Sequence, residues 1–409
     1  MTQPRDSLDF DQFRNEKTRS SYHDLDLICQ PTQIFDTNKV NVLFKADAPK
    51  RIELVSLLKK LKSSGFEKIS LEFTKKPLNA RKAVTSYAFL TDCLVKATWD
   101  FATKIEFPNH NPTDAEKLSI ISVGGYGRRE MAPYSDVDLL FLTPYKITPW
   151  AESVIETILY LLWDLKLKVG HSSRSMRDCL RMGSEDFTIR TAMLEHRFVC
   201  GNVELASELN EKLWKNLFEG TAKEFISAKL KERENRHEKH GQRYMVEPNV
   251  KEGKGGLRDL QSLYWIAKYV YKTQNISDLV ELNVFRSDEQ EQFDKAEEFL
   301  WAVRCQMHHL SDRAIEQLSF DLQVEVATAM GYKDSKARRG VEIFMQDYFR
   351  HATRVGDLTR IFLTSLEAVH AKDEPLLERI FKKRPKIGDE YAVIPVSYTH
   401  LTLPTNTTV

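Results

Sequence analysis

The sequence predicts an α/β domain followed by an all-helical domain, and two observations support that prediction. Short apolar runs typical of strands occur before about residue 185, in the order strand, turn, strand, helix, strand. From about Glu185 to about Leu366 the pattern is helical almost throughout. The chain has 409 residues, which is long enough for two or three domains with a core each.

The charge balance and the cysteines exclude several classes of protein. The 60 Lys and Arg residues nearly cancel the 59 Asp and Glu residues, so a broad basic surface for nucleic acid is not expected. The five cysteines form no CxxC pair and predict neither a zinc ribbon nor a disulfide framework. The N-terminus lacks a secretory signal pattern, and no helix candidate is apolar and long enough to span a bilayer. We therefore expect a cytoplasmic protein whose partners are neither nucleic acids nor membranes.

The first part of the chain predicts an arm and then the start of the α/β domain. Residues 1–45 are polar with weak periodicity and are expected to form a loosely held, flexible arm. A short helix around Lys50–Ser63 and a strand over Ile69–Phe73 follow. A long helix is expected over 77–105, because its apolar positions recur mostly every three, four or seven residues. We place the α/β domain at residues 46–184.

Two buried strands, a helix and a third strand complete this domain. Leu118–Val123 and Val137–Leu142 are short, continuous apolar runs typical of buried strands. A helix is expected to begin after Thr148, which can cap it, with Pro149 at its first position. A third strand over Lys166–Val169 then leads into the loop "GHSSRS".

The remainder divides into a helical domain and two short terminal segments. The helical domain is expected over residues 185–370, with one glycine-rich interruption, "VEPNVKEGKGGLRDLQSLYW". Residues 371–396 are expected to form a linker. Residues 397–409, "SYTHLTLPTNTTV", are Thr-rich, lack apolar rhythm and resemble a non-native tail, so they are left out of the fold prediction.

An acid pair at the start of the second buried strand predicts a metal site. Side chains two apart on a strand point to the same face, about 6 to 7 Å apart. Asp136 and Asp138 therefore present two carboxylates side by side, and each raises the cost of ionising the other. A divalent cation removes that cost. Mg²⁺ held by one or two carboxylates and by substrate phosphates is typical of phosphoryl and nucleotidyl transfer.

A glycine pair supplies the second half of the pattern. Gly124 and Gly125 follow the first buried strand, where missing Cβ atoms let backbone N–H groups approach a polyphosphate. Arg128 and Arg129 can add positive charge to that turn. The alternative is a solvated turn whose aspartates cap backbone groups. The full pattern of strand, Gly-Gly, ten residues and Asp-Val-Asp opening a second strand favours the phosphate and metal site.

These residues carry a resemblance to a known family. "GGYGRREMAPYSDVDLL" resembles the signature of the nucleotidyltransferase superfamily, which includes DNA polymerase β-like enzymes. More narrowly, it is similar to the PII uridylyltransferase/uridylyl-removing family. Further similar stretches are "LKVGHSSRSMRDCL", "TAMLEHRFVCGN" and "RYMVEPNVKEGKGGLRDLQSLYWIAK". The resemblance spans about residues 80–370 and implies a polymerase β-like mixed-sheet domain followed by a helical domain.

The resemblance implies a reaction and its partners. Members transfer UMP from UTP to a tyrosine of the nitrogen-signalling protein PII and release pyrophosphate. Gly124 and Gly125 would form the triphosphate-binding turn, and Asp136 and Asp138 would bind Mg²⁺ or Mn²⁺. Full-length relatives continue into an HD-type hydrolase domain and two ACT domains. Because the sequence ends before them, we expect uridylyl transfer without the uridylyl-removing activity.

The third carboxylate of the superfamily is not obvious in this sequence. It usually lies on a later strand, yet "LKLKVGHS" holds no acid. Asp186 is the candidate for this catalytic role. The alternative is that Asp186 in "GSEDFTIRT" caps a helix.

Several other residues are candidates for contact with the nucleotide. Lys251, Lys254 and Arg258 flank Gly255-Gly256 at a predicted helix start, a natural place for an anion. Asp259 could hold Arg258 in position. The resemblance implies that this glycine-rich loop folds onto the cleft. The candidate nucleotide-binding residues beyond the glycine turn are Ser135, Ser172, Arg174, Lys254 and Arg258.

Two other functions remain open on the sequence alone. An adenylyltransferase acting on glutamine synthetase would share both the diglycine–DxD turn and a GGxRD loop. A truncated, non-catalytic fragment could instead dock PII through its helical domain.

Overall fold

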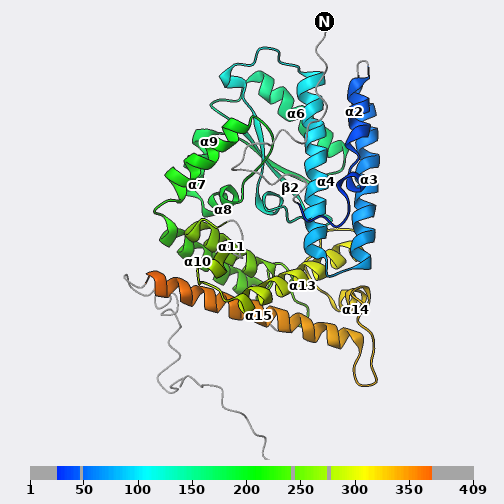
Figure 1. The fold of residues 1–409 in the computed structure, drawn as a ribbon, viewed down its shortest axis with the longest axis vertical. Helices are drawn as coiled ribbons and strands as arrows, with labels where there is room; N and C mark the ends of the chain where they lie inside the picture. The colour runs from blue at the N-terminus through cyan, green and yellow to red at the C-terminus, as the bar shows by residue number, and fades with distance from the viewer. Residues whose placement is uncertain (1–24, 47–48, 241–244, 274–277, 371–409) are drawn as a thin grey trace, which may run out of the picture. The chain divides into compact units, whose positions relative to one another are not determined.

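The computed structural model describes residues 25–46, 49–240, 245–273 and 278–370, and every structural statement here refers to them. The chain divides into two compact units, Met1–Phe362 and Leu363–Val409. The sheet, the candidate site and the helices that surround it belong to the first unit (Figure 1). The segments expected as linker and non-native tail, 371–396 and 397–409, lie outside the described residues.

A mixed four-stranded sheet lies at the centre of the first unit. Its strands are β1 (Ser119–Ser122), β2 (Val137–Thr143), β3 (Val169–Ser175) and β4 (Arg197–Gly201), in the order β3-β2-β1-β4. β1 is antiparallel to both β2 and β4, whereas β2 and β3 are parallel. A parallel pair needs a crossover, and α6 (Pro149–Asp164) supplies it. This helix begins as predicted, because the Thr148 hydroxyl accepts a hydrogen bond from the Ala151 N–H.

Helices cover both faces of the sheet, as Figure 1 shows around β2. On one face Leu140 and Leu142 join a core cluster with α7 (Met176–Glu185), α8 (Phe187–Leu194) and α9 (Val203–Leu213). On the other side α4 (Ala80–Asp100) and α6 contact the edge strands. β2 is buried along nearly its whole length, which explains its almost continuous apolar sequence. Acids at its first positions therefore lie where the core ends.

The N-terminal part is helical where the sequence predicted an arm and a strand. The elements are α1 (Pro31–Ile34), α2 (Thr37–Lys45), α3 (Arg51–Lys75), α4, the π-helix η2 (Phe101–Glu106) and the 3₁₀-helix η3 (Asp114–Glu116). Residues 31–45 are not loosely held, because Ile34, Phe35 and Val40 are buried. Residues 1–24 lie outside the described part.

The strand expected over Ile69–Phe73 is wrong, because these residues belong to α3. Ile69 and Phe73 are four residues apart and lie on the buried face of α3. The buried positions of α3 are Leu54, Leu58, Leu61, Gly65, Ile69 and Phe73. The same spacing indicates a single long helix rather than a helix and a strand. The long helix expected over 77–105 is confirmed by α4 and η2.

Two strands differ from the prediction. β3 begins where the predicted strand over 166–169 ends, so the segment read as a loop, "GHSSRS", is the strand itself. β4 lies beyond residue 184, where only helices were expected, so the sheet draws on chain from both sides of that predicted boundary. β4 completes the sheet by pairing with β1.

The rest of the chain is helical, as predicted. Its elements are η4 (Trp214–Phe218), α10 (Ala222–His240), α11 (Leu257–Tyr271), α12 (Asp278–Glu281), α13 (Ser287–Ser311), α14 (Phe320–Ala329) and α15 (Gly340–His370). α11 packs on α10 and α13, and α13 also packs on α4, so these helices are joined to the sheet-bearing part. No helix within the described ranges is long and apolar enough to cross a membrane.

Candidate functional site

The carboxylate of Asp138 lies between two glycines on neighbouring segments. Asp138 pairs with Gly170 of β3, and its carbonyl oxygen accepts a hydrogen bond of 3.1 Å from the Val123 N–H. A Cβ added to Gly124, which has a φ of +61°, would lie 3.3 Å from Asp138 Oδ2. A Cβ added to Gly170 would lie only 2.5 Å from Oδ1. The structure therefore brings the diglycine turn and the second acid together.

The two acids differ in exposure, and their negative charges repel each other. Asp136 precedes β2 and is exposed, whereas Asp138 is half-buried. Burial and then the charge of Asp136 raise the pKa of Asp138, while the charge of Lys251 lowers it. The net shift is upward, as expected for neighbouring acids whose charge is incompletely compensated. Oxygen ligands of this kind suit a hard divalent cation.

The glycine turn is a short helical turn, α5 (Gly124–Gly127). Its first hydrogen bond joins the Gly127 N–H to the Val123 carbonyl oxygen at 3.0 Å. The N–H groups of Gly124 and Gly125 come before that bond, where a helical turn leaves its donors without an intrahelical acceptor. Ser135 lies in the next turn, where its N–H donates to the Ala132 carbonyl oxygen.

The two arginines of the turn face inward, which differs from the predicted phosphate contacts. The guanidinium of Arg128 is buried and pairs with Glu130 at 2.7 Å and with Glu195. Burial alone would raise the pKa of Asp92, but the charges of Arg197 and then of Arg129 outweigh it and lower that pKa. Arg128 therefore ties the turn to the start of β4, and Arg129 helps to neutralise a buried acid.

Asp186 adopts the alternative role considered for it. Its carboxylate caps α8 by accepting hydrogen bonds from the N–H groups of Thr188 and Ile189, at 2.6 and 3.2 Å. The backbone bond from Ile189 is the largest cause that lowers the pKa of Asp186. Among the described residues no three His, Cys, Asp or Glu side chains are placed to hold a metal ion together. The structure thus offers the acid pair without a third carboxylate.

Ser172 and Arg174 lie on β3 itself. They pair with Leu140 and Leu142, so they share a face of the sheet with Asp138. Ser172 is two residues from Gly170, and Arg174 is four residues from it. His171 points to the opposite face, where its ring lies 6.2 Å from that of Trp163 on α6.

The glycine-rich loop before α11 is held differently from the prediction. Asp259 is fully buried and binds Arg233, Arg236 and His237 rather than Arg258. Burial opposes ionisation of Asp259, but the hydrogen bond from His237 and the two arginines lower its pKa to about 2.

Arg258 and Lys254, the two candidates on this loop, have different surroundings. Arg258 donates to Glu252 at 3.1 Å and to Gln261 at 2.9 Å, whereas Lys254 is exposed. Lys251, which flanks the same glycine pair, is the residue of this loop whose charge reaches Asp138.

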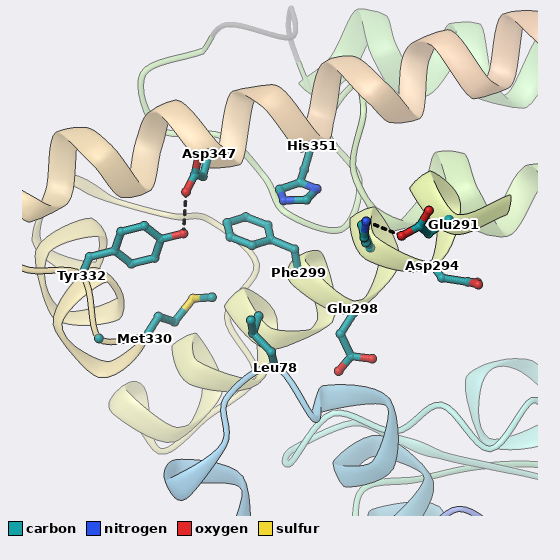
Figure 2. Close-up of a pocket in the computed structure, with 11 residues that line it drawn as sticks. Leu78, Glu291, Asp294, Glu298, Phe299, Met330, Tyr332, Asp347 and His351 are labelled. Carbon is teal, nitrogen blue, oxygen red and sulfur yellow. Dashed lines mark hydrogen bonds and ion pairs between the residues drawn. The ribbon is translucent and has the colours of Figure 1, made fainter. Parts of the chain in front are cut away.

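A cavity of about 670 Å³ lies elsewhere, between α13, α15 and the segment that follows α14. Figure 2 shows its aromatic wall, in which Phe299 stacks on His351 at 4.3 Å and the Tyr332 hydroxyl donates to Asp347. We call it the α13–α15 cavity; its lining includes Leu78, Glu298, Phe299, Tyr332, Asp347 and His351.

A mixed sheet with a diglycine turn after one strand and an acid pair opening its antiparallel neighbour is the arrangement expected of a nucleotidyltransferase fold. A sequence model of the family described as "GlnD PII-uridylyltransferase" matches residues 224–363. The chain is similar to this uridylyltransferase family.

Curated relatives agree over most of the chain. It is 58% identical over 348 residues to the bifunctional uridylyltransferase/uridylyl-removing enzyme of Ruegeria pomeroyi, covering 85% of this chain and 38% of the relative. The enzymes of the same name from Cereibacter sphaeroides and Rhodospirillum rubrum are 54% and 42% identical over 378 and 372 residues. Those alignments cover 90% and 88% of this chain, and 41% and 40% of the relatives. The chain thus spans about two fifths of the length of these relatives.

Proposed function

We propose that this chain transfers UMP from UTP to a tyrosine hydroxyl of PII and releases pyrophosphate. The observation that supports this most is the carboxylate of Asp138, which lies against Gly124 of the diglycine turn and beside Asp136. That arrangement juxtaposes a phosphate-binding turn with a cation-binding acid pair. The names of the relatives supply the nucleotide and the reaction type.

The residues present fit Mg²⁺ or Mn²⁺, with Asp136 and Asp138 as the protein ligands. The raised pKa of Asp138 reflects burial and the neighbouring acid, a cost that a divalent cation would relieve. Phosphate oxygens and water would complete the coordination, as is usual for Mg²⁺. When bound, the metal supplies charge stabilisation for the phosphates and lowers the pKa of an oxygen nucleophile.

The side chains of the sheet and the loops would orient the nucleotide. We assign the triphosphate to the N–H groups of Gly124 and Gly125, because no Cβ there stands between backbone and phosphate. Ser172 and Arg174 share the face of Asp138, and we assign them to contacts with the uracil or the ribose. We assign Lys254 and Arg258, on the loop before α11, to further contacts with the nucleotide.

We place the protein in the cytoplasm, together with PII. All five cysteines lie within the described residues, and none is in a disulfide. Four of them are buried, and burial raises the pKa of thiols such as Cys179, to about 12. These cysteines therefore suit a reducing compartment as small core residues.

One assay tests the proposed function. The chain is incubated with Mg²⁺, purified PII and either labelled UTP or labelled ATP, alongside the double variant Asp136→Asn/Asp138→Asn. We expect label on PII from UTP only, and none with the double variant. Label from ATP alone would indicate an adenylyltransferase, and PII binding without any transfer would indicate a docking fragment. Either result contradicts the proposal.

A further inference from the structure

Lys251 occupies a backbone position fixed from both sides. The Asn249 side-chain oxygen accepts hydrogen bonds from the N–H groups of Lys251 and Glu252, at 3.1 and 2.7 Å. The Lys251 carbonyl oxygen accepts from the Arg258 N–H at 2.9 Å. Behind the loop, Gly255 has a φ of +82°, and its N–H donates to the buried Asp259 at 2.8 Å. These bonds hold the backbone of the loop in place at Lys251.

The loop that carries Lys251 and the turn that carries Asp136 are both joined to the segment that follows α13. The Val250 N–H donates to the Glu316 carbonyl oxygen at 2.9 Å. The Tyr134 hydroxyl donates to Asp312 at 3.1 Å, directly after α13 ends. These bonds bring Lys251 and the acid pair to one place, although they are more than 110 residues apart in sequence.

Lys251 differs from the neighbouring arginines in its distance from the nearest carboxylate. Arg304 binds Glu316 at 2.6 Å, and Arg258 binds Glu252 at 3.1 Å, so each arginine has a close carboxylate. The ammonium of Lys251 is 3.9 Å from Glu252, beyond hydrogen-bond distance. Burial and then the arginine charges lower the pKa of Lys251, which indicates a crowded cationic position suited to an added anion. Its charge also acts on Asp138.

We propose that Lys251 binds the β- and γ-phosphates of UTP and stabilises the departing pyrophosphate, a role that rests on the proposed function above. In that step the tyrosine oxygen bonds to the α-phosphorus, and its proton passes to water. The bond between the α-phosphorus and the oxygen bridging to the β-phosphate breaks, and pyrophosphate leaves with the electron pair. A lysine ammonium is a point charge suited to this task. It would face the diglycine turn from the helical side of the cleft.

Ligand affinities measured on the full chain test this role without requiring transfer to PII. The affinities of pyrophosphate, UTP and UMP, each with Mg²⁺, are compared by calorimetry for the unmutated chain, Lys251→Met and Lys251→Arg. We expect Lys251→Met to weaken pyrophosphate and UTP by about tenfold to a hundredfold, the worth of one charged hydrogen bond, and to leave UMP unchanged. Lys251→Arg should recover part of the loss.

The control removes the same charge from the other end of α11. Lys272 lies 3.6 Å from Glu219 and over the ring of Trp214, so Lys272→Met should leave all three affinities within about twofold. Unchanged pyrophosphate affinity in Lys251→Met, or an equal loss of UMP affinity, overturns the proposal. If the unmutated chain binds these ligands as expected but never modifies PII, the proposed function fails while the role of Lys251 stands.

Discussion

Acidic side chains lie close together in two regions of this molecule, the site around Asp138 and the α13–α15 cavity. The two regions differ in the charged partners of these acids. In the cavity Glu291 pairs with Lys295 at 2.6 Å, and Asp347 binds both the Tyr332 hydroxyl and Arg350. At the site the carboxylate of Asp138 lies against glycine backbone and beside another acid. Glu291 and Asp347 of the cavity are thus paired with cations of the protein, whereas the acid pair at the site is arranged for a cation from outside.

Buried acids elsewhere show the same contrast in their pKa values. Asp259 is fully buried, yet His237 and two arginines lower its pKa to about 2. Asp138 is less buried, yet its pKa is raised. Burial raises the pKa of both acids; at Asp259 the neighbouring cations outweigh it, whereas at Asp138 the charge of Asp136 adds to it. An acid held with its charge uncompensated is a candidate for function rather than for stability.

The largest expected effect is on catalysis, from Asp138→Asn. Transfer should fall by about a thousandfold or more, because several kcal/mol of transition-state stabilisation would be lost with a cation ligand. Without metal, however, the variant should unfold at the same denaturant concentration or a higher one, since burial and Asp136 disfavour the native carboxylate. Radiolabel transfer and urea unfolding measure the two quantities. A marked loss of stability would show that Asp138 is structural.

For Asp259→Asn we expect a loss of stability instead. The free energy of unfolding should fall by about 3 to 5 kcal/mol, because Arg233 and Arg236 would be left without their shared buried carboxylate. Urea unfolding monitored by tryptophan fluorescence checks this. A change below about 1 kcal/mol would mean that this acid contributes no more than a surface pair.

Gly170→Ala should separate geometry from charge at the site. The new Cβ would lie 2.5 Å from Asp138 Oδ1, so the carboxylate must move. Transfer should fall by about a hundredfold while the chain stays folded, since a displacement near 1 Å at a reacting centre has that cost. Ser173→Ala, one of the β3 positions on the other face, is the matched control. Equal activities in the two variants would contradict the proposed placement of Asp138.

The smallest expected effect is on the pH dependence of stability. The native pKa of Asp138 is raised, so without metal its contribution to stability is favourable at low pH and is lost as pH rises through the native pKa. Asp138→Asn should therefore gain more stability relative to the unmutated chain at pH 7 than at pH 4. For Asp259 the sign reverses: its stabilisation is present above about pH 4 and is lost as pH falls toward about 2. Unfolding curves at several pH values measure both differences.

The sequence predicted the parts of the fold whose pattern is local. β1 and β2 are buried and read as apolar runs, and α6 carries its own cap and proline. β3 lies at the edge of the sheet, so the polar sequence "VGHSSRS" gives no apolar signal. The run Ile69–Phe73 misled because its β-branched and aromatic residues also fit one face of α3.

The acids and glycines of the site could be predicted from the sequence, but the contacts that hold its cations could not. The spacing of Asp138 from Gly124 follows from two consecutive strands, and the structure brings them together. The burial of Arg128 depends on Glu195, which is 67 residues away in the chain. The position of Lys251 depends on how its loop packs on the segment that follows α13. Such pairings arise only when distant elements pack, so a local pattern cannot reveal them.

The most direct test of the account is the thermal stability of the chain with Mg²⁺ and UTP, added singly and together. We predict that the unfolding midpoint of the unmutated chain rises only when both are present, by several degrees at a hundredfold excess over the dissociation constant. Asp136→Asn/Asp138→Asn should show no such rise. An equal rise in the double variant would contradict the claim that these two acids bind a cation together with a nucleoside triphosphate.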